Sequence, residues 1–174
     1  DPALLDSYEP ERRPIGTRNV LRSLRREPQT PGSGLGDDLF VSYLDGSSTP
    51  DTAQPGQRAP HAWIERSGRR ISTLDCFGSG LTLVAARHDT GWRRAAAEIA
   101  ATGLPLHCLT LAHDRAGAEA AARYRVADGT AVLVRPDGYV AARLNAGADH
   151  HAVLRAAIAA TVGRPAGIEL PMAG

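Results

Sequence analysis

The residues that could do chemistry in this sequence include two cysteines, Cys76 and Cys108. Thiol–disulfide exchange needs a thiolate of low pKa, usually in a Cys-x-x-Cys motif at a helix N-terminus. Neither cysteine lies in such a motif. We therefore interpret both as buried free thiols that act as small hydrophobic residues. A disulfide between them stays open from the sequence, although a reducing compartment disfavours it.

Three pairs that contain histidine could supply a general base with its orienting carboxylate, or ligands for a metal ion. They are His88-Asp89, His113-Asp114 and His150-His151. The first two pairs stand where helices are expected to begin, so we interpret their aspartates as helix N-caps. The two histidines of the third pair follow each other in a helical turn and point about 100° apart, so they do not easily share one metal.

Ser79 lies between two glycines, but it does not form the Gly-x-Ser-x-Gly elbow of a serine nucleophile. The glycines are more simply typical of a flexible turn. Across these candidates, we expect no catalytic, cofactor-binding or metal-binding residue in this chain.

The elements that must position these residues follow from apolar runs, turn residues and helical periodicity. The predicted strands are 61–65, 70–74, 81–86, 104–111, 131–134 and 139–142, and the predicted helices are 91–101, 114–124 and 149–162. Ser67-Gly68 and Pro136-Asp137-Gly138 provide the two hairpin turns. The predicted core includes eight apolar residues: Leu83, Val84, Ile99, Leu109, Val132, Leu133, Leu154 and Ile158.

The order of these elements predicts an α/β, thioredoxin-like domain: a central mixed sheet flanked by helices, with an N-terminal hairpin addition. The final hairpin and helix alone would also fit other α/β units. In the thioredoxin-like arrangement, the turn that would carry the reactive thiol is 87–92, and it contains no cysteine. The proline expected before the hairpin strand is also absent, since Asp128-Gly129-Thr130 stands there. The domain is therefore expected to be redox-inactive.

The N-terminal residues 1–26 have a helical pattern that two prolines interrupt. Pro10 is expected to open a helix at its first position, and Pro14 to kink it or restart it. Leu4, Leu5 and Tyr8 form an apolar side with no partner in the predicted core. The domain organisation is therefore a kinked connecting helix over 1–26, a Pro/Gly-rich linker over 27–58, a thioredoxin-like domain over 59–164 and a tail over 165–174.

Composition excludes several partners. The formal net charge is +1, and all 20 basic residues are arginine, so no strong field would draw the chain to nucleic acid or to an anionic membrane. No apolar run reaches membrane-spanning length and no signal peptide opens the sequence, so a cytoplasmic location is the expectation. The only methionine is Met172, which indicates a processed chain or a piece of a longer one.

Four stretches carry a resemblance to one family. They are Leu4-Leu5-Asp6-Ser7-Tyr8-Glu9-Pro10-Glu11-Arg12-Arg13-Pro14, Pro55-Gly56-Gln57-Arg58-Ala59-Pro60-His61-Ala62-Trp63, Ile71-Ser72-Thr73-Leu74-Asp75-Cys76-Phe77-Gly78 and Val132-Leu133-Val134-Arg135-Pro136-Asp137-Gly138-Tyr139-Val140-Ala141. The first resembles the segment that closes the flavin- and substrate-binding part of FAD-dependent phenol and polyketide hydroxylases. The other three resemble the thioredoxin-like C-terminal domain of that family. Cys76 departs from the larger aliphatic residue that is usual there.

The resemblance implies a FAD- and NAD(P)H-dependent monooxygenase that hydroxylates a phenol or a polyketide aromatic ring. This sequence has no Gly-x-Gly-x-x-Gly after a first strand, so the motifs that bind FAD are expected upstream of Asp1. The chain is then the C-terminal, structural piece of the enzyme. Its partners are the missing N-terminal flavin and substrate domain and, through the whole enzyme, an aromatic small molecule. A homo-oligomer is left open.

Two alternatives of other classes remain at this point. The chain could be a free-standing, redox-inactive thioredoxin-like binding module that acts through a partner. It could also be a thiol oxidoreductase or peroxidase, which the missing cysteine argues against.

Overall fold

The computed structural model describes residues 8–25, 53–147 and 149–162. Its elements are α2 (Tyr8–Arg25), β1 (Trp63–Arg66), β2 (Arg69–Ser72), the 3₁₀ helix η1 (Thr73–Cys76), β3 (Leu81–Ala86), α4 (Thr90–Ala100), β4 (Leu106–Leu111), α5 (Arg115–Tyr124), β5 (Thr130–Val134), β6 (Val140–Asn145) and α6 (His150–Thr161). The predicted order of strands and helices from residue 61 onward is confirmed.

The central sheet has four strands in the order β4-β3-β5-β6. β3 and β4 are parallel, with Leu81 opposite Leu106, whereas β5 is antiparallel to both of its neighbours. β1 and β2 form a separate antiparallel hairpin. The mixed sheet with this added hairpin is the predicted thioredoxin-like arrangement.

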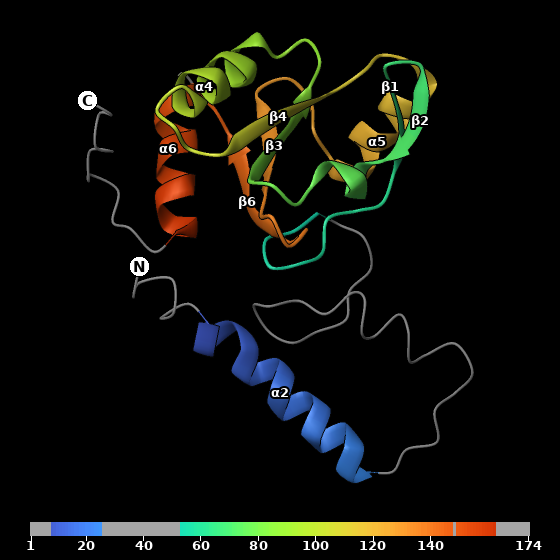
Figure 1. Ribbon diagram of the computed structural model, residues 1–174, viewed down its shortest axis with the longest axis vertical. Helices are drawn as coiled ribbons and strands as arrows, with labels where there is room; N and C mark the ends of the chain where they lie inside the picture. Colours follow the sequence, from blue (N-terminus) through green and yellow to red (C-terminus); the bar gives the residue numbers. More distant parts are fainter. Residues whose placement is uncertain (1–7, 26–52, 148, 163–174) are drawn as a thin grey trace.

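Helices cover both faces of the sheet (Figure 1). On one face α4 and α6 enclose a core around Leu83, Leu133 and Leu154. On the other face α5 and the β1–β2 hairpin enclose a second core around Val84 and Val132. All eight predicted core residues are buried. Alternate residues of β3 and β5 supply the two faces because side chains alternate along a strand.

Residues 53–60, which we name the strap, pack on the sheet although the sequence assigns most of them to a linker. Gly56 N–H donates to the Val140 carbonyl, and Val140 N–H donates to the Gln57 carbonyl, each at 2.8 Å. The strap therefore pairs with the start of the outer strand β6. The Tyr124 hydroxyl, buried in α5, donates to the Pro60 carbonyl at 2.7 Å and holds the far end of the strap.

The N-terminal helix does not restart at Pro14, which was one of the two predictions for this residue. α2 is a single helix that contains Pro14, and Tyr8 and Glu9, before Pro10, already belong to it. Pro10 lies in the first turn, where a backbone N–H has no helical partner, so its missing donor costs little. Pro14 removes the hydrogen bond to the Pro10 carbonyl, but Pro10 is exposed and water can satisfy that carbonyl. The expected apolar contributions of Leu4 and Leu5 lie outside the described residues, as do residues 26–52 and the tail beyond residue 162.

No helix among the described residues is both long and apolar enough to span a bilayer.

Candidate functional site

The turn between β3 and α4 occupies the position at which a thioredoxin-like fold would carry a reactive thiol. Asp89 caps α4, accepting a hydrogen bond from Trp92 N–H at 3.2 Å. The predicted capping role of Asp89 is thus confirmed. A helix N-terminus favours a thiolate, but here it faces a carboxylate, and no thiol is present in the turn to be activated.

Asp89 does more than cap α4. Its Oδ2 accepts from Gly129 N–H at 2.6 Å, and its Oδ1 lies 3.1 Å from Nε2 of His150 in the first turn of α6. The His150 ring also packs edge-on against Trp92, with ring centroids 4.8 Å apart. Both carboxylate oxygens are therefore committed to structural contacts, and this buried aspartate joins three segments of the chain.

The aspartate of the His113-Asp114 pair also caps a helix. Asp114 caps α5 by accepting from Gly117 N–H at 2.7 Å, as predicted. His113 stacks on His88 across the two loops, with centroids 3.8 Å apart. Within residues 8–25, 53–147 and 149–162, no group of three or more histidine, cysteine or acidic side chains is arranged to hold a metal ion.

Both cysteines are free thiols and both are half-buried, so the prediction of full burial was too strong. Cys108 packs with the core on the α4–α6 side of the sheet, whereas Cys76 packs with the core on the α5 side. Burial raises the pKa of Cys108 to about 11, with Arg93 opposing the shift. Burial also raises the pKa of Cys76, against the opposing effect of Arg66. Neither thiol is tuned for nucleophilic attack.

The Ser79 Oγ lies 3.0 Å from Nε2 of His107, an exposed residue of β4. Both side chains border an open pocket of ≈ 260 Å³, to which Asp75 also contributes. The Asp75 carboxylate accepts from Ser72 N–H in the capping box of η1. It is therefore engaged in holding η1, and we assign no nucleophilic role to the serine.

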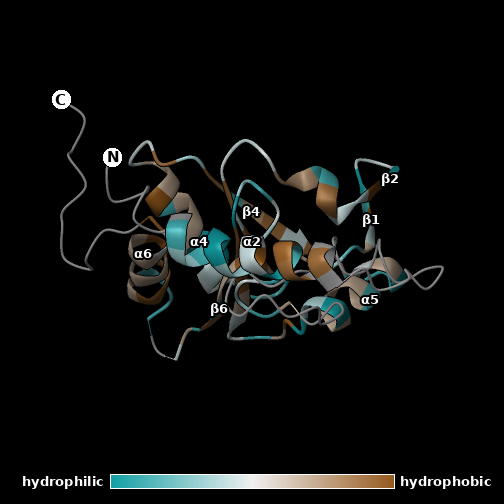
Figure 2. Cartoon of the chain, turned by 90° about the horizontal axis from the view of Figure 1, so that it is seen from below, coloured by the Kyte–Doolittle hydropathy of each residue, from teal (hydrophilic) through white to brown (hydrophobic). Residues whose placement is uncertain are grey.

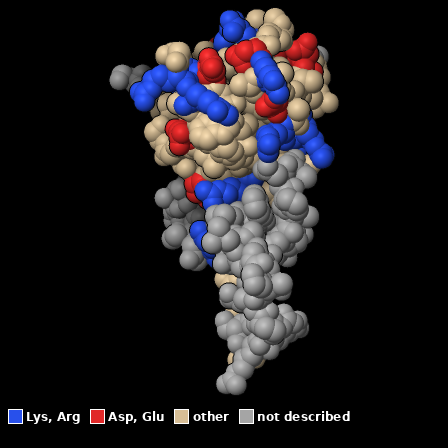
Figure 3. Space-filling view, turned by 90° about the vertical axis from the view of Figure 1, so that its right-hand side faces the viewer, with Lys and Arg blue, Asp and Glu red and all other residues tan. Residues whose placement is uncertain are grey.

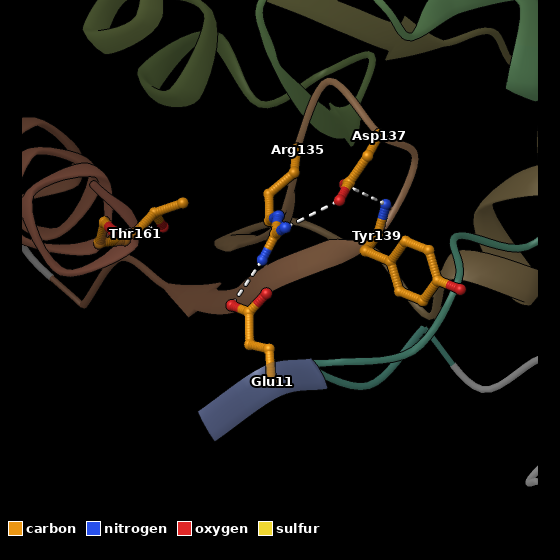
Figure 4. Close-up of polar contacts among 6 residues, drawn as sticks. Glu11, Arg135, Asp137, Tyr139 and Thr161 are labelled. Carbon is orange, nitrogen blue, oxygen red and sulfur yellow. Dashed lines mark hydrogen bonds and ion pairs between the residues drawn. The ribbon is translucent and has the colours of Figure 1, made fainter. Parts of the chain in front are cut away.

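A cluster of charged side chains joins α2 to the β5–β6 turn, and we name it the Arg135 cluster (Figure 4). Arg135 donates through Nη1 to Glu11 of α2 and through Nη2 to Asp137, both at 2.7 Å. Asp137 also accepts from Tyr139 N–H at 3.2 Å. Burial lowers the pKa of Arg135, but the contributions of Glu11 and Asp137 together outweigh it, so the pKa is raised. The sequence identified the turn but not this contact.

The half-buried residues of α2 recur at helical spacing, at Glu11, Pro14, Ile15 and Arg18. They define an inner face. The opposite, outer face exposes Val20 and Leu24, which are 59% and 72% exposed, and Leu21, which is 48% exposed, lies at its flank next to Pro14. Val20 is nine residues after Glu11 and thus about 180° around the helix from it. Figure 2 views the molecule from the side on which α2 lies, and apolar segments of the helix are in view.

Another exposed apolar side chain, Trp63, lies on the β1–β2 hairpin. Trp63 is 46% exposed and carries Arg70 over its ring at 4.8 Å, with His61 edge-on at 5.0 Å. Figure 3 shows the side of the molecule that carries the hairpin, where arginine and acidic side chains are interspersed. On that face the charges do not separate into a single basic patch.

Comparison with known proteins gives the context of these surfaces. The family model for the C-terminal part of aromatic-ring hydroxylases matches residues 52–165. The chain is 35% identical over 188 residues to a tetracenomycin B2 monooxygenase-dioxygenase of Streptomyces olivaceus, covering 93% of this chain and 35% of that protein. It is 36% identical over 168 residues to the aklavinone 12-hydroxylase RdmE of Streptomyces purpurascens, covering 80% of this chain and 31% of that protein.

Solved structures are similar over the same range. A ternary complex of aklavinone-11 hydroxylase with FAD and aklavinone matches with a TM-score of 0.78 at 29% identity, over 94% of this chain and 36% of that one. The flavin-dependent monooxygenase PieE, in complex with FAD and substrate, matches with a TM-score of 0.73 at 27% identity, over 95% of this chain and 41% of that one. The chain spans about a third of the length of the curated relatives that it matches.

Proposed function

Since this chain belongs to the aromatic-ring hydroxylase family, whose C-terminal portion it matches, we propose that it is the C-terminal portion of a FAD- and NAD(P)H-dependent monooxygenase. The full enzyme hydroxylates a phenol or a polyketide aromatic ring. In it, the thioredoxin-like domain is a structural part, and α2 is the element that connects this domain to the flavin- and substrate-binding portion.

The observation that carries the proposal is the two-sided α2. Its inner face contacts the thioredoxin-like domain through Glu11, while its outer face exposes Val20 and Leu24, with Leu21 at the flank. Burying a side chain of this size stabilises a contact by about 1.5–3 kcal/mol before entropic costs. Exposed apolar side chains gathered on one helix face are typical of an interaction site. We assign this outer face to the flavin- and substrate-binding portion of the longer enzyme.

The β3–α4 turn of this domain does not fit FAD. A dinucleotide-binding turn needs Gly-x-Gly-x-x-Gly between a strand and a helix, whereas the β3–α4 turn reads Arg87-His88-Asp89-Thr90-Gly91-Trp92. Its first position after the strand is a bulky arginine, and the helix N-terminus that would face a pyrophosphate holds the Asp89 carboxylate. We therefore assign flavin binding to the other portion of the enzyme, and no contact with the flavin to the β3–α4 turn.

The experiment compares the 174-residue chain with a longer protein that includes the upstream part of its reading frame. The longer protein is expected to bind FAD and to oxidise NADPH or NADH with hydroxylation of an aromatic ring, while the 174-residue chain binds no flavin. Flavin that stays stoichiometric with the short chain through gel filtration would contradict the division of roles. A reading frame that starts within a few residues of Asp1 would instead support the free-standing binding module.

Two variants test the role of the outer face. Leu24→Asp places a charge among the exposed apolar residues, while Asn19→Asp places the same charge about 140° around the helix from Leu24. Leu24 is 72% exposed, so Leu24→Asp should leave the melting temperature of the short chain unchanged. In the longer protein it should lower stability and flavin retention much more than Asn19→Asp does. Equal effects of the two variants would remove the outer face from the interface.

A further inference from the structure

The Arg135 cluster differs from a simple ion pair because one guanidinium contacts two carboxylates from different elements. The Arg135 guanidinium donates from two different nitrogens to two carboxylates, one on its own turn and one on α2, each at 2.7 Å. Charge-assisted hydrogen bonds of this length are the strong ones, and the planar fork of arginine fixes the direction of both. The guanidinium therefore cannot follow Glu11 if α2 rotates without giving up Asp137.

Asp137 makes the anchor rigid on the side of the domain. One of its oxygens accepts from Arg135 and the other accepts from Tyr139 N–H, within the turn that connects β5 to β6. That turn is itself fixed, because Gly138 N–H donates to the Arg135 carbonyl and Arg135 N–H donates to the Tyr139 carbonyl. The side chain that reaches α2 thus starts from a closed hairpin turn of the central sheet.

Burial separates this contact from the Arg13–Glu9 ion pair on the same helix. The Arg135 and Glu11 side chains are each only 27% exposed, whereas Arg13 and Glu9, which pair along the helix at 3.1 Å, are 77% and 74% exposed. An exposed pair one turn apart contributes little and is screened by salt. The chain therefore offers a matched pair of interactions on one helix, one across an interface and one within the helix.

We propose that Arg135 is a positioning residue: it fixes the angle at which α2 leaves the thioredoxin-like domain, and Asp137 pre-orients it for this task. Resting on the proposed function, the second part of this proposal is that the same cluster sets how the flavin-binding portion sits on the C-terminal domain. Most of the stability of a helix in a protein comes from tertiary contacts, and the contact through Arg135 supplies one that also has a fixed direction.

The test uses the 174-residue chain, with Cys76→Ser and Cys108→Ala as background and spin labels at two exposed positions, Thr17→Cys on α2 and Arg155→Cys on α6. Pulsed electron-spin resonance measures the distance distribution between the labels. The parent is expected to give one narrow distribution. Glu11→Gln and Arg135→Lys should broaden it, because the first loses the carboxylate and the second loses the fork; Glu9→Gln should leave it unchanged.

Hydrogen exchange read by mass spectrometry gives a second measurement in the same variants without labels. Exchange of α2 amides should accelerate about tenfold in Glu11→Gln, the size expected for a charged hydrogen bond that is partly screened. Amides of β3 and β5 should keep their protection, which shows that the domain is folded. The charge exchange Glu11→Arg with Arg135→Glu should restore much of the order, since the new arginine can bridge residues 135 and 137.

A narrow distribution and unchanged α2 exchange in Arg135→Lys would overturn the proposal, and so would equal effects of Glu9→Gln and Glu11→Gln. None of these readouts involves flavin or substrate. A failure here is therefore distinguishable from a failure of the proposed enzymatic role, which the longer protein tests separately.

Discussion

The raised pKa of Cys108 gives a quantitative prediction about thiol chemistry in this fold. Burial raises that pKa from its ordinary value of 9.0 to about 11. A shift of two units reduces the thiolate fraction at neutral pH about a hundredfold. A more basic thiolate is also a better nucleophile, and with a Brønsted coefficient of about 0.4–0.5 this returns about six- to tenfold of the loss. The pKa alone should therefore slow alkylation of Cys108 at least about tenfold.

The assay follows iodoacetamide modification of Cys108 by mass spectrometry in a Cys76→Ser variant. The same protein in concentrated guanidinium chloride supplies the reference rate for an unfolded thiol. Half-burial adds a steric barrier, so tenfold slowing is a lower limit. Cys76, whose pKa is raised less, serves as the comparison thiol in a Cys108→Ala variant. Folded protein in which Cys108 reacts as fast as in denaturant would refute the reasoning, and a faster reaction would reopen the oxidoreductase interpretation.

Three further predictions concern stability. Gly117→Ala should lower the melting temperature by several degrees, because a Cβ would lie 2.1 Å from the Ala112 carbonyl oxygen, and overpacking of about 1–3 kcal/mol or more outweighs the gain of about 1 kcal/mol in helix propensity. The control is Gly16→Ala, which should not destabilise the protein because no atom lies within 4 Å of the added Cβ. Thermal denaturation followed by circular dichroism compares the two variants. Tyr124→Phe should cost about 1–2 kcal/mol in urea denaturation, since it removes the buried hydroxyl that donates to Pro60, and a loss no larger than for an exposed tyrosine would contradict this. Above about pH 9 the unfolded chain loses the Cys108 proton that the folded chain keeps until about pH 11, so stability should fall with rising pH through this window; the fall should be smaller in Cys108→Ala, and identical pH profiles would count against the shift.

The sequence predicted those features that depend on neighbouring residues. The caps Asp89, Asp114 and Asp149 lie next to the helices they begin, and all three accept from the N-terminal backbone of those helices. The buried strand 81–86 has the predicted bounds because it is apolar apart from Thr82 and is bordered by turn residues. The interpretation of the β3–α4 turn as redox-inactive also rests on neighbouring residues, since it needs only the absence of a cysteine there, and it stays a prediction.

Contacts between distant residues could not be predicted in this way. Glu11 and Arg135 are 124 residues apart, and no periodicity connects an acidic residue of a helix to an arginine of a hairpin turn. The second role of Asp89, as acceptor for Gly129 N–H, depends on two loops that meet only in the folded sheet. The domain boundaries proposed from the sequence stay a prediction, but the strap shows that Gly/Pro-rich composition does not by itself identify a linker.

The strap also has a consequence for how this domain avoids aggregation. β6 is an outer strand, and an outer strand with free backbone groups is a template for pairing with another chain. The strap occupies the first of these groups at Val140, and Arg143 of the same strand reaches across to the Ala53 carbonyl. A protein shortened to begin at residue 59 would keep every helix and strand of the thioredoxin-like domain. It would, however, expose the start of β6 and remove the Ala53 acceptor of Arg143, which keeps its hydrogen bonds to the Tyr124 and Arg125 carbonyls. It should therefore self-associate through that edge more readily than a protein that begins at residue 53.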